Sequence, residues 1–108
     1  MDLQELSELV SSNWLFTEEY YPALKGLSEK ERRLFSLWHI LMHQVKAAGK
    51  LSAAIEREEH GILMDEENLR LATRNFLLNT IRLADVANMN MDELEREVGV
   101  WISDKHQP

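Results

Sequence analysis

The sequence predicts an all-α protein, an antiparallel four-helix bundle with a long second helix. Two observations favour helices. Apolar residues recur at spacings of three and four, and no stretch shows the apolar-polar alternation of a strand. Only four Gly and two Pro interrupt the 108 residues, and the composition does not change along the chain. We therefore expect a single helical domain, 1–108, with helices at about 3–12, 29–59, 66–88 and 91–102.

The first helix is predicted from a capping box, in which Asp2 precedes Glu5 by three residues. An apolar stripe follows and fades at Asn13. The connection 13–27 is rich in aromatic residues, which are unusual in a solvated linker: Trp14, Phe16, Tyr20 and Tyr21. We expect this connection to lie against the bundle.

The second helix is predicted to be long. Ser28 and Glu31 form another capping box, and Gly61 provides a helix stop after about 45 Å of helix. Seven residues recur at spacings of four and three over three heptads, and the pattern predicts that they face the core. We call them the heptad stripe: Leu34, Trp38, Leu41, Val45, Ala48, Ser52 and Ile55.

The third and fourth helices begin at residues suited to cap them, Asp65 and Asn90. The third helix carries a long apolar pattern that ends at Asn88. The fourth presents Leu94, Val98 and Trp101 at i, i+4 and i+7, and the tail 103–108 is expected to fray.

Composition excludes several classes of function. A net charge of -7 argues against a nucleic-acid partner, and zero cysteines exclude thiolate metal sites and a Cys nucleophile. The chain has no apolar run near the ~20 residues that span a bilayer, and its acidic start does not resemble a signal peptide. We therefore expect a cytoplasmic protein with no membrane partner.

His39 and His43 lie four residues apart on the second helix, so both rings share one face. Such a pair can bind zinc with a nearby carboxylate. The glutamate of a His-Glu-x-x-His motif is absent, because Ile40 and Leu41 fill the interval. The simpler interpretation is two polar histidines beside the core, one of them paired with a carboxylate.

Carboxylates gather at the end of the hairpin between the second and third helices. Mg²⁺ requires such oxygen ligands, but acids at a helix N-terminus also have an ordinary capping role. A solvated acidic rim is the simpler interpretation of these residues: Glu56, Glu58, Glu59, Asp65, Glu66 and Glu67.

Cations and amides are predicted to meet between the second and third helices. If these helices pair antiparallel across Gly61, Lys50 lies near Asn75, Lys46 near Asn79, and His43 near Arg82, with Asp85 close to His39. One interpretation is an anion site for phosphates. The other is that the Lys and Arg stems cover apolar surface while their charges stay in water.

The second helix also has apolar residues beside the heptad stripe, namely Leu37, Ile40 and Leu51. Three shorter helices cannot cover all sides of so long a helix. Exposed apolar stripes usually mark helix–helix interfaces, so we expect a homo-oligomer, at least a homodimer.

Three segments resemble the MazG-like all-α nucleoside triphosphate pyrophosphohydrolases. Gly49 to Ile55 is similar to the family's Gly-Glu-Leu-x-x-Ala stretch, and Ala72 to Asp85 is similar to its second metal helix with a Leu-Ala-Asp ending. Met89 to Leu94 resembles the connection into the family's last helix. The resemblance covers about 34–98 and implies a MazG-like fold assembled as dimers or tetramers.

The family's Mg²⁺ lies between Glu-Glu-x-x-Glu and Glu-x-x-Asp segments. By the resemblance, these acids fall on five residues of this chain that are not acidic: Lys46, Ala47, Lys50, Ala72 and Asn75. Lys offers donors and no acceptor, and its charge repels a divalent cation. We therefore expect no metal site, no cofactor and no metal-dependent hydrolysis.

Three hypotheses follow. In the first, a MazG-like protein without pyrophosphohydrolase activity binds a nucleotide or another anion, with Trp14 or Tyr20 stacking on a base. Its ligand residues are Lys46, Lys50, Asn75, Asn79, Arg82, His43 and Trp14. The second is an oligomeric helical interaction module with no small-molecule ligand. The third is an active hydrolase that binds Mg²⁺ through displaced acids: Glu56, Glu59, Glu66 and Glu67.

Overall fold

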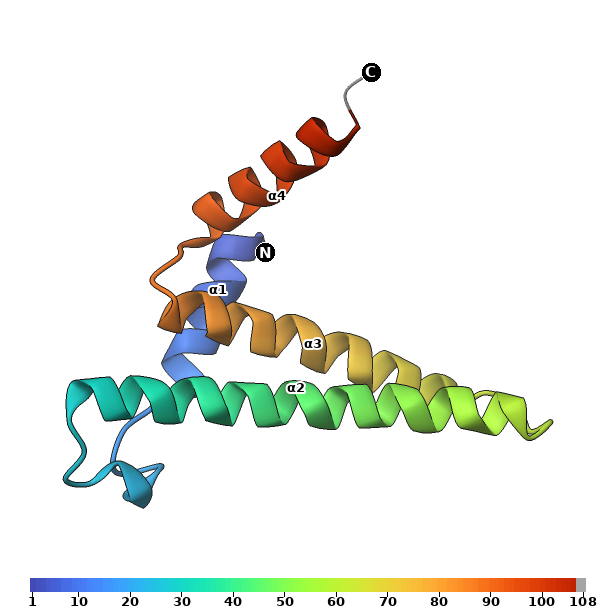
Figure 1. The fold of residues 1–108 in the computed structure, drawn as a ribbon, viewed down its shortest axis with the longest axis horizontal. Coiled ribbons are helices and arrows are strands. Elements are labelled where there is room, and N and C mark those ends of the chain that lie inside the picture. The colour runs from blue at the N-terminus through green and yellow to red at the C-terminus, as the bar shows by residue number, and fades with distance from the viewer. Residues whose placement is uncertain (107–108) are drawn as a thin grey trace.

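The computed structural model describes residues 1–106, and within that range the chain forms helices and no strand. The order is α1 (Leu3–Asn13), a single 3₁₀ turn (Pro22–Leu24), α2 (Glu29–Glu59), α3 (Glu66–Val86) and α4 (Met91–Lys105). Figure 1 shows α2 and α3 side by side and α4 extending away from them. The all-α class is confirmed.

The helix starts follow the capping residues predicted from the sequence. The side chains of Asp2, Ser28, Asp65 and Asn90 each accept a hydrogen bond from a backbone N–H in the first turn. At Ser28 both halves of the capping box form. After α2, Gly61 adopts a φ of 75°, where a side chain would be strained, so the chain reverses at this point.

Two helix ends differ from the prediction. Helix α3 ends at Val86, two residues earlier than expected, and Asn88 takes up a left-handed φ of 60°. Helix α4 continues to Lys105, so the frayed tail expected from residue 103 is wrong for 103–105. Gln107 and Pro108 lie outside the described residues. Basic Lys105 in the last turn of α4 favours this extension, because it complements the helix dipole.

Helices α2 and α3 form a hairpin in which the chain runs in opposite directions. Gln44 Nε2 donates to Thr80 Oγ1 at 3.2 Å across this interface. Ile40, Ala47 and Ala54 are buried on α2 at intervals of seven residues, and Ala72 is buried on α3. Small side chains at these positions let the two backbones approach closely.

The prediction that the heptad stripe faces the core of the chain is wrong. All seven of its residues are exposed, including Trp38 with 61% of its surface accessible. The column that α3 covers lies on another side of α2, where the residues are smaller. The longest apolar stripe of the sequence therefore has no neighbour within residues 1–106.

A second packing centre lies where α1 crosses α3. Its buried members are Val10, Ile81, Ala84 and Met91, with Leu94 packed at the edge. Helix α4 contributes only its first turns here, and Val98 and Trp101 are exposed. Among residues 1–106, helix α4 therefore packs against α1 and α3 and does not cover α2.

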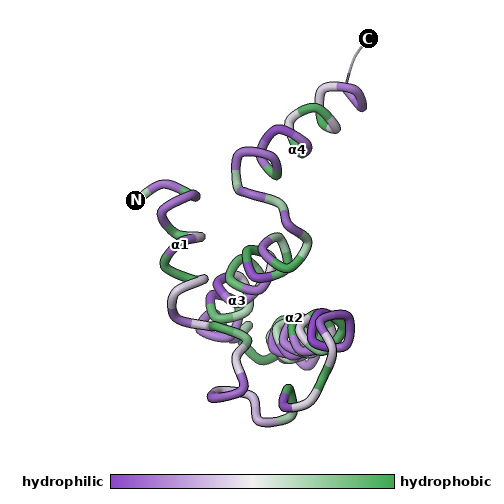
Figure 2. Tube along the Cα trace, turned by 90° about the vertical axis from the view of Figure 1, so that its left-hand side faces the viewer, coloured by the Kyte–Doolittle hydropathy of each residue, from purple (hydrophilic) through white to green (hydrophobic). Residues whose placement is uncertain are grey.

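The described chain is extended for its size. Its accessible surface is 8210 Å², about 2,000 Å² more than is typical of a monomer of this mass. Its Cα radius of gyration is 17.1 Å, against about 13 Å for a compact domain. Figure 2 shows hydrophobic residues along α4, which extends away from α2 and α3. No helix among residues 1–106 is both long and apolar enough to cross a membrane.

Candidate functional site

A cleft of about 440 Å³ lies between α2 and α3, next to the end of α1. We call it the cationic cleft. All seven of the residues predicted as ligand residues line it, together with Tyr21, His39 and Leu78: Trp14, His43, Lys46, Lys50, Asn75, Asn79 and Arg82. The antiparallel hairpin thus brings together side chains that are separated by up to 68 positions.

Arg82 is the most unusual residue of the cleft. Only 6% of its surface is exposed, and its Nε is buried without a hydrogen-bond partner among the described residues. Its Nη2 lies 3.5 Å from the hydroxyl of Tyr21, and its guanidinium lies 4.8 Å from the ring centre of Phe16. No carboxylate of residues 1–106 pairs with it. Burying a cation without a counter-charge costs free energy, and an anion bound beside it would offset part of that cost.

Two further cations enter the cleft from α2. Lys46 and Lys50 are one helical turn apart and line the same cavity as Arg82. No Asp or Glu is among the ten lining residues. The cleft is therefore positive in a chain whose net charge is -7.

His39 and His43 extend this polar wall. Their Nε2 atoms are 3.1 Å apart, and the Tyr21 hydroxyl lies 3.3 Å from His39 Nε2. Burial lowers the pKa of both rings, and nearby Arg82 and Lys46 lower it further. His43 also lowers the pKa of His39. Both histidines therefore favour the neutral form, in which one Nε2 donates and the other accepts.

Among residues 1–106, no carboxylate pairs with either of these histidines, although such a partner was expected. Asp85 was predicted to approach His39, but it lies toward α1, in a shallow surface pocket with Glu8. The reason is helical phase: Ile81, four residues earlier on the same side of α3, packs against Val10 of α1. The side chains that pack against the His39 ring are instead aromatic.

An aromatic cluster holds His39 in place. The His39 ring stacks on Phe35 and meets Phe16 and Tyr21 edge-on, with ring centres 4.9–6.1 Å apart. Phe16 and Tyr21 come from the connection between α1 and α2, and Leu24 in the same segment is fully buried. This part of the connection therefore packs on α2, as the aromatic content predicted.

Of the adjacent pair Tyr20 and Tyr21, the second lines the cleft and not the first. Tyr20 was proposed as a stacking residue, but 65% of its surface is exposed and it does not line the cleft. Tyr21 does. Adjacent residues in a loop point in different directions, and no periodicity exists there to separate them.

The two amides of the cleft are held in different ways. Asn75 Oδ1 accepts hydrogen bonds from Arg74 Nε and Nη2, both at 3.2 Å. Asn79 is buried, and its Nδ2 donates to the Asn75 carbonyl at 2.9 Å. The Asn79 Oδ1 is buried without a partner among the described residues.

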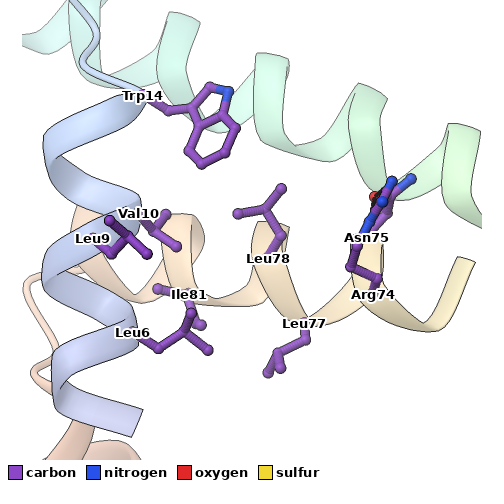
Figure 3. A pocket seen from close by; sticks show the side chains of 9 residues that line it. All are labelled: Leu6, Leu9, Val10, Trp14, Arg74, Asn75, Leu77, Leu78 and Ile81. Atoms are coloured by element: carbon purple, nitrogen blue, oxygen red, sulfur yellow. Dashed lines mark hydrogen bonds between the residues drawn. The ribbon is translucent and has the colours of Figure 1, made fainter. Parts of the chain in front are cut away.

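A second cavity of about 500 Å³ adjoins the cationic cleft (Figure 3). We call it the apolar groove. It lies where α1 crosses α3 and shares Trp14, Asn75 and Leu78 with the cationic cleft. Its other lining residues are Leu6, Leu9, Val10, Arg74, Leu77 and Ile81.

The acidic residues do not form a comparable site. Glu56 and Glu59 line a depression with His60 that involves α2 alone, and Glu56 lies 3.7 Å from the His60 ring. Within residues 1–106, no three or more His, Asp or Glu side chains gather as metal ligands would. Glu66 and Glu67 occupy the first turn of α3, outside this depression.

No family model, curated protein or solved structure matches this chain.

Proposed function

We propose that this protein binds a phosphate-bearing small molecule, such as a nucleotide, in the cationic cleft and does not hydrolyse it through bound metal. The observation that carries the proposal is the buried Arg82, which shares the cleft with Lys46 and Lys50 and with no carboxylate. An anion with two or more charges would offset these cations and accept charge-assisted hydrogen bonds from the cations that line the cleft.

The proposal includes a MazG-like origin. The resemblance places the family's metal carboxylates at residues that include Lys46, Lys50 and Asn75, and these three line one cleft here. Ammonium groups at such positions interact with phosphate oxygens directly, whereas Mg²⁺ needs carboxylate oxygens. We propose that the lysines take over the charge of the lost ions.

The experiment is a thermal-shift panel of nucleoside tri-, di- and monophosphates, each with and without Mg²⁺. Ligand at 100 times its Kd stabilises the folded state by about 2.7 kcal/mol. We expect a rise in Tm that does not require Mg²⁺. The Lys46→Glu/Lys50→Glu variant should lose this rise.

The matched control is Lys25→Glu/Arg96→Glu, which changes the net charge equally at exposed positions outside the cleft. It should keep the ligand response. Binding by the Lys46→Glu/Lys50→Glu variant with unchanged affinity would overturn the proposal. Pyrophosphate release in the presence of Mg²⁺ or Mn²⁺ would instead support the hydrolase that uses displaced acids.

A second candidate function, an oligomeric interaction module, is favoured by the exposed heptad stripe. A strict spacing of four and three is the pattern of a coiled-coil seam. The excess surface of about 2,000 Å² per chain is more than the roughly 600–1,000 Å² that each partner buries in an interface of standard size. We propose that a second copy of this chain covers the stripe, forming a homodimer.

An antiparallel pairing of two α2 helices gives the better fit. When Leu41 of one copy faces Val45 of the other, Trp38 faces Ala48, so the largest side chain meets a small one. In that register Lys30 lies at the same level as Glu56, so the start of one helix, which carries a cation, is beside the acidic end of the other. A parallel pair would instead place the acidic ends together.

Light scattering at micromolar concentration tests this dimer. Leu41→Glu should halve the mass, whereas Leu63→Glu should not, because Leu63 is exposed in the α2–α3 loop outside the stripe. A wild-type protein with monomeric mass would exclude the dimer and leave the anion proposal untouched.

A further inference from the structure

We infer that the ligand of the cationic cleft is amphipathic, with a phosphate head and an adjoining apolar chain or ring that occupies the apolar groove. This inference rests on the proposed anion binding and adds the chemical class of the remainder of the ligand.

The two cavities are continuous with each other. Trp14, Asn75 and Leu78 line both cavities, so a molecule can extend from one into the other without crossing a polar barrier. Figure 3 shows the Leu78 side chain directed toward the Trp14 indole, with the groove to one side of them. The shared wall is thus mostly apolar.

The two cavities differ in chemistry. The groove is lined by leucines, Val10, Ile81 and the face of Trp14, with Arg74 and Asn75 at its edge. In the cleft, three cations and two half-buried histidines line the same space. Among the lining residues of the two cavities no carboxylate occurs. The combined site is therefore apolar at one end and positive at the other.

The apolar groove is partly open to solvent. Leu9, Trp14 and Leu77 each leave nearly half of their surface accessible. The groove lies between crossing helices and spans about two turns of each, from Leu6 to Trp14 and from Arg74 to Ile81. A cavity this short accommodates a small apolar group better than the long face of another helix.

Inorganic phosphate, ethyl phosphate and hexyl phosphate form the test series, with Kd measured by calorimetry on the full chain. Each fully buried methylene group lowers Kd about fourfold, and each methylene group that is partly buried in an open groove lowers Kd about twofold. We therefore expect hexyl phosphate to bind at least about tenfold tighter than ethyl phosphate.

Two matched variants locate the effect. Leu77→Gln should remove most of the hexyl advantage and leave the affinity for inorganic phosphate unchanged. Leu83→Gln changes another exposed leucine of α3 that lines neither cavity, and should alter neither affinity.

The outcomes separate the two proposals. Equal Kd values for ethyl and hexyl phosphate would overturn this inference and leave the anion site standing. Hexyl phosphate binding that survives Lys46→Glu/Lys50→Glu would also overturn it, because the groove would then bind apolar molecules by itself. If none of the three compounds binds, the anion site fails and this inference fails with it.

Discussion

The two sides of α2 differ in the size of their apolar residues. Toward α3, the buried column consists of Ile40, Ala47 and Ala54, and a parallel column carries polar His43 and Lys50. Away from α3 lies the heptad stripe, with its Trp and Leu residues exposed. The apolar pattern of the second side is the stronger one in the sequence, yet the first side forms the interface within the chain.

The difference shows how small side chains can determine helix packing. A close approach of α2 and α3 needs alanines, and it leaves a gap beside them in which polar side chains of both helices meet. Large side chains prevent such an approach and suit a seam between two long helices. One side of α2 thus builds the cationic cleft, and the other leaves the heptad stripe uncovered within residues 1–106.

The largest effect should come from Ile40→Ala. Only 1% of Ile40 is exposed, so the change removes buried methyl groups and should lower the free energy of unfolding by about 2–5 kcal/mol. Its sequence neighbour Leu41, 49% exposed, belongs to the heptad stripe. Denaturant unfolding at several protein concentrations measures the free energy of unfolding of Ile40→Ala and of Leu41→Ala.

For Leu41→Ala we expect a decrease in the free energy of unfolding that becomes smaller as the protein is diluted, because the substitution weakens only the proposed contact between two copies. If Leu41→Ala and Ile40→Ala are equally destabilising at every concentration, the contrast between the two sides is wrong.

Arg82→Met should stabilise the ligand-free protein, by about 1–2 kcal/mol, because it removes a buried charge that no carboxylate of the described chain offsets. The same variant should lose its Tm response to phosphate compounds. Thermal unfolding with and without ligand measures both effects. A destabilised variant would show that the Tyr21 and Phe16 contacts outweigh the burial of the charge.

Gly49→Ala should raise the free energy of unfolding by about 0.5–1 kcal/mol, because Gly is unfavourable inside a helix and a Cβ at this position meets no atom within 4 Å. Gly99→Ala in α4 is the matched control with equally open space. At low protein concentration the two substitutions should raise the free energy of unfolding by similar amounts. A smaller gain for Gly49→Ala at high concentration would place the second copy against this part of α2.

The smallest effect concerns pH. The pKa of His39 and His43 is lowered in the folded chain, so the unfolded chain binds protons more readily. Stability from these rings is complete above about pH 6.5 and declines as the pH falls below that value. The groups facing them are Tyr21, Arg82 and Lys46, which add no acid to the pair.

Unfolding of wild type and of His39→Gln/His43→Gln between pH 7.5 and 5.5 tests this dependence. The variant should lose less stability on acidification than the wild type. Equal slopes would contradict the lowered pKa values.

Several features were predictable from the sequence because they depend on neighbours along the chain. Capping residues such as Ser28 and Asp65 fix where helices begin, and Gly61 fixes the hairpin between α2 and α3. Once two long helices pair antiparallel, residue numbers predict which positions lie at the same level, although the direction of each side chain also depends on helical phase, as Asp85 shows. For that reason Lys46, Lys50 and Asn75 were expected together and do line one cleft.

Only the tertiary structure decided which side of α2 is covered. Periodicity shows that a stripe is apolar, but it does not show whether the stripe meets another helix of the same chain or remains open. The choice depended on how closely two backbones can approach, which Ala47, Ala54 and Ala72 set together across the interface. The tertiary structure also decided that Arg82 is buried without a counter-charge. Asp85 lies toward α1 and not beside Arg82, because Ile81 on the same side of α3 packs against α1.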